Sequence, residues 1–351
     1  DLEVKQPKMQ GALQNDRGVL MRVLPDVPTE PDPAHCLVVL VDTSASRALG
    51  FTAQNRRVQD LLRSLAKGAG ADVPVMVAAY DQDFQVIYEG KAADADVARA
   101  LTQRRALGAS NLGQALEALQ VNLQKNKGRY DRLLLVGDGV NTAGEAELAP
   151  LVATLKKTGL RRADALVVGG ITDEATMRTL VRSLPQAGAL ITDRDLSAVA
   201  RKLSLSTAAK IKVEVPGAKW VWPQDLKGVQ PGDERLIYAE LEAGAKTPAG
   251  IQLGGKAHQI GDAVQVDSVM IERAWVQARI ESLQARLSEL DPDMQGAVKK
   301  QITELSVKHR VLSPYTALLV LETERDYARY GIDRTALADI LSVEGGQVAR
   351  L

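Results

Sequence analysis

The chain has 351 residues, of which 45% are hydrophobic and 25% are charged. This length exceeds one ordinary hydrophobic core and predicts two or more domains. Basic and acidic residues number 44 each, and this balance argues against nucleic-acid binding, which calls for a basic excess or stripe. No apolar run approaches the roughly 18 residues of a membrane-spanning helix. The single cysteine, Cys36, excludes an intramolecular disulfide.

Residues 1–33 are expected to lead into the first domain. The apolar stretch Val19–Leu24 predicts a strand, and the prolines at 25, 28, 31 and 33 predict an extended linker after it. We expect this strand to pair with strands much later in the chain, so that the intervening domain is inserted into a second one.

Residues 34–205 alternate between apolar strands and amphipathic helices. The expected strands are Leu37–Val41, Val75–Ala79, Leu133–Val136, Ala165–Val168 and Ala189–Ile191, with an edge strand at Phe84, Val86 and Tyr88. The expected helices carry the stripes Val58–Leu65, Leu112–Leu123, Leu148–Leu155, Met177–Leu184 and Leu196–Leu203. This alternation predicts an α/β fold, a doubly wound and mainly parallel sheet with helices on both faces.

Residues 206–269 predict a small β domain, because short strands are separated there by proline and glycine. The expected strands are Lys210–Val215, Lys219–Trp222, Arg235–Leu241, Gly250–Leu253 and Val264–Val269. Residues 270–325 predict a helical hairpin, broken at Asp291-Pro292, and a final strand Tyr315–Leu321. Residues 326–351 predict a polar tail with a short helix around Leu337–Leu341. The tryptophans Trp220, Trp222 and Trp275 are expected to pack where the β domain meets the first long helix.

Oxygen-bearing side chains gather where strands of the predicted sheet end. Asp42, Ser44 and Ser46 come directly after the first buried strand, at the carboxyl edge where open α/β folds bind ligands. Ser110, before the helix that starts at 112, and Asp138, after the strand that ends at 136, belong to loops of the same edge. Carboxylate and hydroxyl oxygens suit a hard cation such as Mg²⁺. The sequence therefore predicts a metal site on three loops.

Other interpretations of these residues stay open. The first cluster would also serve as a helix N-cap and turn. A metal that only stiffens the edge of a structural scaffold is a second alternative. The segment Gly108–Gly113 is one residue off the spacing of a hydrolase nucleophile elbow, but no base near Ser110 is identified. Gly250–Ala257 nearly spells a phosphate loop, yet it ends in alanine where serine or threonine is needed, and so predicts a β turn.

The pattern Asp42-x-Ser44-x-Ser46, followed by Ser110 and Asp138, resembles the metal-ion-dependent adhesion site of von Willebrand factor type A domains. The family has threonine in place of Ser110, and often an apolar residue in place of Arg47. The resemblance implies a Rossmann-like fold and a non-enzymatic adhesion or binding function. It also implies hydroxyls that bind Mg²⁺, Mn²⁺ or Ca²⁺ directly, carboxylates that often act through water, and a protein partner whose acidic group completes the coordination.

Two later segments, Glu272–Trp275 and Val311–Leu318, resemble the C-terminal region of inter-alpha-trypsin inhibitor heavy chains and their bacterial relatives. The likeness spans residues 15–325 and implies a further domain before the A domain, of which residues 1–10 would be the last remnant. The Asp-Pro-His-Phe cleavage site of the heavy chains is absent, so their covalent transfer to a glycan is not expected. We expect an exported protein, periplasmic, secreted or at the cell surface.

Overall fold

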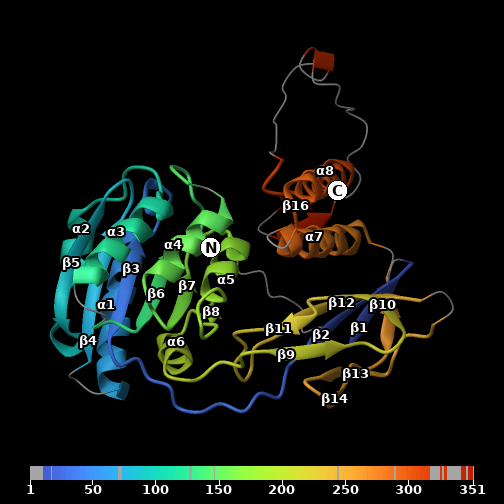
Figure 1. Ribbon diagram of the computed structural model, residues 1–351, viewed down its shortest axis with the longest axis horizontal. Coiled ribbons are helices and arrows are strands. Elements are labelled where there is room, and N and C mark those ends of the chain that lie inside the picture. Colours follow the sequence, from blue (N-terminus) through green and yellow to red (C-terminus); the bar gives the residue numbers. More distant parts are fainter. Residues whose placement is uncertain are drawn as a thin grey trace. The chain divides into compact units, whose positions relative to one another are not determined.

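The computed structural model describes residues 11–350 apart from 17, 70–72, 126–128, 146, 243–244, 267, 288–289, 317–324, 326–327, 330–340 and 345–346. The chain divides into two compact units (Figure 1). Unit 1 comprises Asp1–Val23, Lys212–Asp225 and Glu234–Leu351, and unit 2 comprises Leu24–Ile211 and Leu226–Asp233. In sequence, unit 2 is thus placed between parts of unit 1.

Unit 2 is built on a six-stranded sheet in the order β5-β4-β3-β6-β7-β8. The strands are β3 (Leu37–Asp42), β4 (Pro74–Tyr80), β5 (Phe84–Lys91), β6 (Arg132–Gly137), β7 (Arg162–Val167) and β8 (Leu190–Ile191). All neighbours are parallel except the edge strand β5, which is antiparallel to β4. The predicted mainly parallel sheet and its edge strand are confirmed.

Helices cover both faces of this sheet (Figure 1). One face packs against α1 (Phe51–Ala69), α2 (Ala98–Gln103) and α6 (Leu196–Leu203), and the other against α3 (Leu112–Lys125), α4 (Leu148–Lys157) and α5 (Glu174–Val181). A short 3-10 helix η2 (Ala92–Asp94) follows β5. Strand β3 serves both cores because successive side chains point to opposite faces: Val39 and Val41 join the first core, and Val38 and Leu40 the second.

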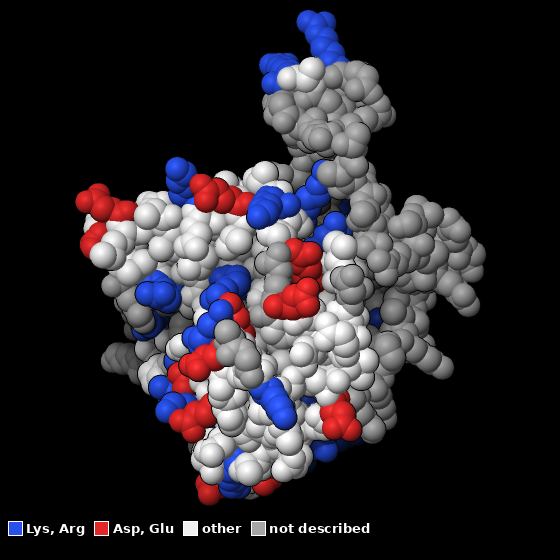
Figure 2. Space-filling model, turned by 90° about the vertical axis from the view of Figure 1, so that its right-hand side faces the viewer, with Lys and Arg blue, Asp and Glu red and all other residues white. Residues whose placement is uncertain are grey.

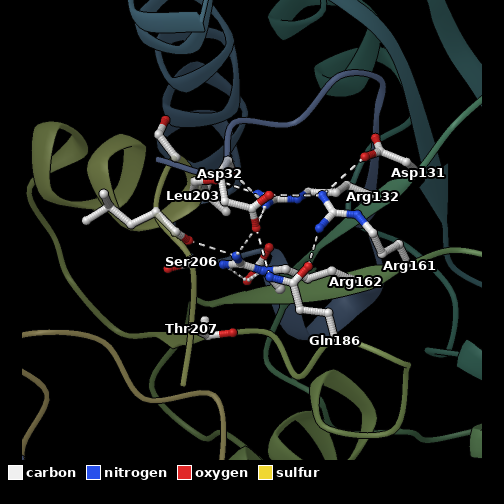
Figure 3. Close-up of polar contacts among 12 residues, drawn as sticks. Asp32, Asp131, Arg132, Arg161, Arg162, Gln186, Leu203, Ser206 and Thr207 are labelled. Carbon is white, nitrogen blue, oxygen red and sulfur yellow. Dashed lines mark hydrogen bonds and ion pairs between the residues drawn. The ribbon is translucent and has the colours of Figure 1, made fainter. Parts of the chain in front are cut away.

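At the amino ends of β6 and β7, a charge cluster joins the chain segments that enter and leave unit 2 (Figure 3). Asp32, in the proline-rich linker, accepts hydrogen bonds from the side chains of Arg132, Arg161, Arg162 and Gln186. Arg132 and Arg162 also donate to the backbone carbonyls of Leu203 and Leu205, at 2.5 and 2.8 Å. The fold therefore brings both ends of unit 2 to one group of buried arginines, which the sequence does not predict.

Among its described residues, unit 1 contains a two-stranded sheet near its C-terminal end and two larger sheets, in the orders β10-β12-β2-β1-β15 and β11-β9-β13-β14. Their strands are β1 (Ala12–Asn15), β2 (Gly18–Val23), β9 (Ile211–Glu214), β10 (Ala218–Trp222), β11 (Asp225–Leu226), β12 (Arg235–Leu241), β13 (Gly250–Leu253), β14 (Lys256–Gln259) and β15 (Ala263–Gln265). Strand β2 pairs antiparallel with β12. The predicted pairing of the lead-in strand with the later β strands is confirmed.

One predicted strand in this region is wrong in part. Residues 264–269 were expected as one strand, but β15 ends at Gln265 and helix α7 begins at Val269. The reason is local: the Ser268 hydroxyl accepts a hydrogen bond from the Met270 amide at 3.3 Å, which caps the helix there. The predicted β turn is confirmed, since Gly254 and Gly255 connect β13 to β14.

The predicted helical hairpin consists of α7 (Val269–Arg286) and α8 (Pro292–His309). Asp291 caps α8, accepting a hydrogen bond from Met294 at 2.9 Å. Trp275 of α7 lies 5.6 Å from Trp220, measured between ring centroids, and Trp222 donates to Glu281 of α7 at 3.4 Å. The expected packing of the tryptophans on the first long helix is confirmed.

Several expectations fall on parts of the chain that the structure does not describe. These are residues 1–10, the strand Tyr315–Leu321 from residue 317 onward, and the short helix around 337–341 except its last residue. Leu341 instead begins β16 (Leu341–Glu344), which pairs with β17 (Gln347–Arg350).

The described residues include no helix long and apolar enough to cross a membrane. On the face drawn in Figure 2, acidic and basic side chains are interspersed. This mixture fits the equal numbers of acidic and basic residues in the chain.

Candidate metal centre

Four of the five predicted ligands meet where β3 and β6 end. Asp42 is the last residue of β3, and Asp138 directly follows β6, its parallel neighbour. Ser44 and Ser46 lie in the loop after β3, the second of them in the short 3-10 helix η1 (Ala45–Arg47). The Ser46 hydroxyl donates to Oδ2 of Asp138 at 2.8 Å and lies 3.1 Å from the Ser44 hydroxyl. The structure thus places these oxygens in one connected group.

Asp42 is fully buried, but only one of its carboxylate oxygens has a partner. Oδ1 accepts the Ser44 amide at 2.8 Å, whereas Oδ2 has no hydrogen-bond partner among the described residues. Burial raises the pKa of Asp42 to about 6; hydrogen bonds from Ser44 oppose the rise, and the charge of Asp138 adds to it. A cation beside this carboxylate would satisfy Oδ2 and favour the charged form.

Ser110 is held in place by a third loop. Its backbone amide donates to the Thr142 hydroxyl at 2.8 Å, and its carbonyl accepts the Thr142 amide at 2.9 Å. Its hydroxyl shares a hydrogen bond with Tyr80. Burial, with the nearby charges of Asp42 and Asp138, raises the pKa of Tyr80 well above its usual value. Tyr80 therefore lies beside Ser110 and near both carboxylates, but no described hydrogen bond joins Ser110 to the other four candidates.

Backbone hydrogen bonds fasten these loops to one another. The Ala45 amide donates to the Gly108 carbonyl at 2.9 Å, which ties the first loop to the one carrying Ser110. The Asp173 amide donates to the Asp138 carbonyl at 2.7 Å, which ties the third loop to the segment after β7. Ligands held this way need little rearrangement to bind an ion.

Arg47 also belongs to the centre, and the sequence does not predict its contact. Its side chain is 5% exposed and forms an ion pair with Asp138. Its Nε donates to the Ser46 hydroxyl at 3.3 Å. The sequence marks Arg47 as a departure from the family pattern, but only the fold reveals that the guanidinium lies against two candidate ligands. Tyr80 and Thr142 are missed as well, because neither belongs to a recognisable motif.

The donor set of this centre is unusual in having few carboxylates. Across the described residues, no group of three or more His, Cys, Asp or Glu side chains is placed to hold a metal ion. The candidate centre instead offers two aspartates, and serine hydroxyls make up the rest. Such hard oxygen donors fit Mg²⁺, Mn²⁺ or Ca²⁺ and leave room for a carboxylate from outside the chain.

Comparison with known families decides what this domain is. Residues 37–141 match the family model of the von Willebrand factor type A domain. This part of the chain is a von Willebrand factor type A domain. The matched residues include all five candidate ligands of the A domain. Domains of this family generally mediate protein–protein interaction or adhesion and are generally not enzymes.

Two solved structures are similar to the chain at low sequence identity and with TM-scores below 0.5. A von Willebrand factor type A protein from Catenulispora acidiphila is 15% identical, with 98% of this chain and 94% of that chain covered and a TM-score of 0.41. The ArnB paralog VWA2 from Sulfolobus acidocaldarius is 14% identical, with 86% and 89% covered and a TM-score of 0.33. No curated protein matches the chain. The resemblance of the C-terminal region to inter-alpha-trypsin inhibitor heavy chains stays a prediction.

Proposed function

We propose that the A domain binds a divalent metal ion, Mg²⁺ or a similar hard cation, through Asp42, Ser44, Ser46, Ser110 and Asp138. The ion in turn binds a carboxylate of a protein partner. The observation that carries this proposal is the Oδ2 atom of Asp42, a buried acceptor with no hydrogen-bond partner among the described residues. A buried carboxylate oxygen left in this state is costly, and a cation held by the adjacent hydroxyls would remove the cost.

The charges at this edge favour an acidic partner. The two carboxylates only balance the charge of a divalent ion, so the metal-loaded centre carries no negative excess that would repel an acidic partner. Ser46 is exposed to solvent, which gives a partner access to the ion. A carboxylate is the natural last ligand of a hard cation in such a place.

Replacing a direct ligand should weaken the metal site without disturbing the fold. We expect Ser44→Ala to reduce Mg²⁺ affinity at least about tenfold, since loss of even supporting residues around metals costs this much. Isothermal titration calorimetry measures the change, and Ser64→Ala, on helix α1, is the matched control. Equal affinities for the wild type and Ser44→Ala would contradict the proposed ligand set.

Exposed apolar side chains on the neighbouring loops support a role in partner binding. Leu49 is 97% exposed, Leu107 59% and Ile171 82%. Hydrogen bonds connect the loops that carry these residues. The loop of Leu49 bonds the loop of Leu107 through the Ala45 amide and the Gly108 carbonyl, and it bonds the loop of Ile171 through Arg47 and the Val168 carbonyl. We infer that these three side chains contribute apolar contacts to the partner that the ion binds.

A partner that flanks its carboxylate with apolar side chains should therefore bind best. We expect Mg²⁺-loaded protein to prefer synthetic peptides with aspartate between leucines over peptides with aspartate between serines. Changing Leu49, Leu107 and Ile171 together to serine should reduce the preferred binding about tenfold. Fluorescence polarisation measures the peptide affinity. Val121 on α3 is 52% exposed, and Val121→Ser serves as the control. Binding that survives both chelation and Ser44→Ala would favour a structural scaffold instead.

A further inference from the structure

Arg47 is buried within the centre rather than lying on its surface. The guanidinium is paired with Asp138, which is 1% exposed, and Nε donates to Ser46 at 3.3 Å. A third contact is made to the Val168 carbonyl, beyond β7. Two of the three partners are proposed metal ligands, so the arginine contacts the oxygens that the ion would use.

The space that holds this side chain is provided by a glycine. Gly169 has a φ of 127°, and a Cβ atom there would lie 2.5 Å from Nη1 of Arg47. A side chain at 169 would thus collide with the guanidinium, whereas glycine leaves it room. Val168 and Gly169 therefore form the site in which the guanidinium of Arg47 lies beside Asp138.

A guanidinium and a metal ion make opposing demands on the same oxygens. The guanidinium is a cation, and its N–H groups donate hydrogen bonds to lone pairs that a metal needs. Two cations close to one carboxylate also repel each other, strongly so where water is excluded. The Oδ2 atom of Asp42 remains without a partner even with Arg47 in place, so of the two aspartates the arginine bonds only Asp138.

We infer that Arg47 is a built-in competitor of the metal ion. It holds Asp138 and Ser46 when no metal is bound, and metal binding requires its guanidinium to leave Asp138. This inference rests on the proposed metal site and adds a residue that sets its affinity. The A domain would accordingly bind metal more weakly than its oxygen ligands alone would allow, and the buried charge of Asp138 would keep a partner without metal.

Removal of the arginine charge tests the competition. We expect Arg47→Met to bind Mg²⁺ at least about tenfold more tightly in calorimetry, because the competing cation is gone. Without metal, the same variant should melt at a lower temperature than the wild type, since Asp138 has lost its buried counter-charge. Saturating Mg²⁺ should reduce this difference in melting temperature between Arg47→Met and the wild type. Arg47→Gln keeps a hydrogen-bond donor but no charge, and it should also bind Mg²⁺ more tightly than the wild type. This second variant keeps the test decisive if Arg47→Met does not fold.

The matched control is Arg104→Met at the same edge of the sheet. Arg104 pairs with Asp81 at 2.8 Å and donates to Thr43, but contacts none of the five candidate ligands in the described bonds. Its removal should leave Mg²⁺ affinity unchanged. Equal Mg²⁺ affinity of the wild type and both Arg47 variants would overturn the competition while leaving the metal site in place. Absence of Mg²⁺ binding in all of them would instead overturn the metal site itself.

Discussion

Asp32→Ala is expected to lower the free energy of unfolding of unit 2 by about 3 kcal/mol, the cost of leaving a buried charge without its partner. Asp32 is the carboxylate that faces Arg132 and Arg162, whose side chains are 1% and 0% exposed (Figure 3). Arg162 would retain Asp164 at 2.7 Å, but Arg132 would keep only backbone carbonyls. Urea unfolding followed by fluorescence or circular dichroism measures the loss.

The exposed pair of Asp60 and Arg63 is the control for this variant. Its side chains are 53% and 59% exposed, so Asp60→Ala should change stability by no more than about 0.5 kcal/mol. If Asp32→Ala lowered the free energy of unfolding no more than Asp60→Ala does, the ion pairs of Asp32 would contribute no net stability, because their attraction would only balance the cost of burying the charges. The two ends of unit 2 would then be held by other contacts, such as the hydrogen bond from the Asp32 amide to the Ser204 carbonyl.

The stabilisation by Asp32 should depend on pH in one direction. Burial tends to raise the pKa of Asp32, but the hydrogen bond from Gln186 and the charges of Arg132 and Arg161 outweigh it, so the pKa lies below its usual 3.8. A carboxyl group with a lowered folded-state pKa stabilises the fold above its unfolded pKa and ceases to do so as pH falls through the folded value. The difference between wild type and Asp32→Ala should therefore be full at neutral pH and shrink below pH 3.8.

The fold of unit 2 could be predicted because its signals are local and strong. A run such as Leu37–Val41 has apolar side chains at every position, which is typical of a strand buried on both faces. The short helix α2 and the strands β1 and β14 were not predicted, since four to six residues leave too little periodicity to recognise. Arg132 and Arg162 are the first residues of strands that are otherwise apolar except for Asp164, and nothing local indicates that the charges of these arginines are buried.

For the candidate centre, sequence predicts the ligands but not their surroundings. Parallel strands end at one edge, so the sequence predicts that Asp42 and Asp138 lie together. In the structure Ser46 donates to Asp138 and lies in hydrogen-bond contact with Ser44, whose amide donates to Asp42. The pairing of Arg47 with Asp138 joins residues 91 positions apart and depends on the side-chain direction within η1. The partnerless Oδ2 of Asp42 is likewise invisible in sequence, because it depends on which donors the fold places nearby.

Strand β2 is expected to be indispensable to unit 1. It lies between β12 and β1 in the five-stranded sheet, and Val19 and Met21 are fully buried. Deleting residues 1–25 would expose a long edge of β12 and remove part of the core, so unit 1 should lose its cooperative unfolding transition. Unit 2 should stay folded, because its sheet packs against its own two helical layers.

Hydrogen exchange measured by mass spectrometry distinguishes the two units in one experiment. Peptides from β10 and β12 should lose protection in the deleted protein, whereas peptides from β3 and β6 should keep theirs. A point variant tests the same dependence more gently: Met21→Asp places a charge in a fully buried position and should destabilise unit 1 by at least about 3 kcal/mol. Leu236→Asp, on the neighbouring strand β12 but 46% exposed, should cost far less. Unchanged protection of β12 after the deletion would mean that unit 1 folds without β2. The pairing of β12 with β2 would then contribute little to stability.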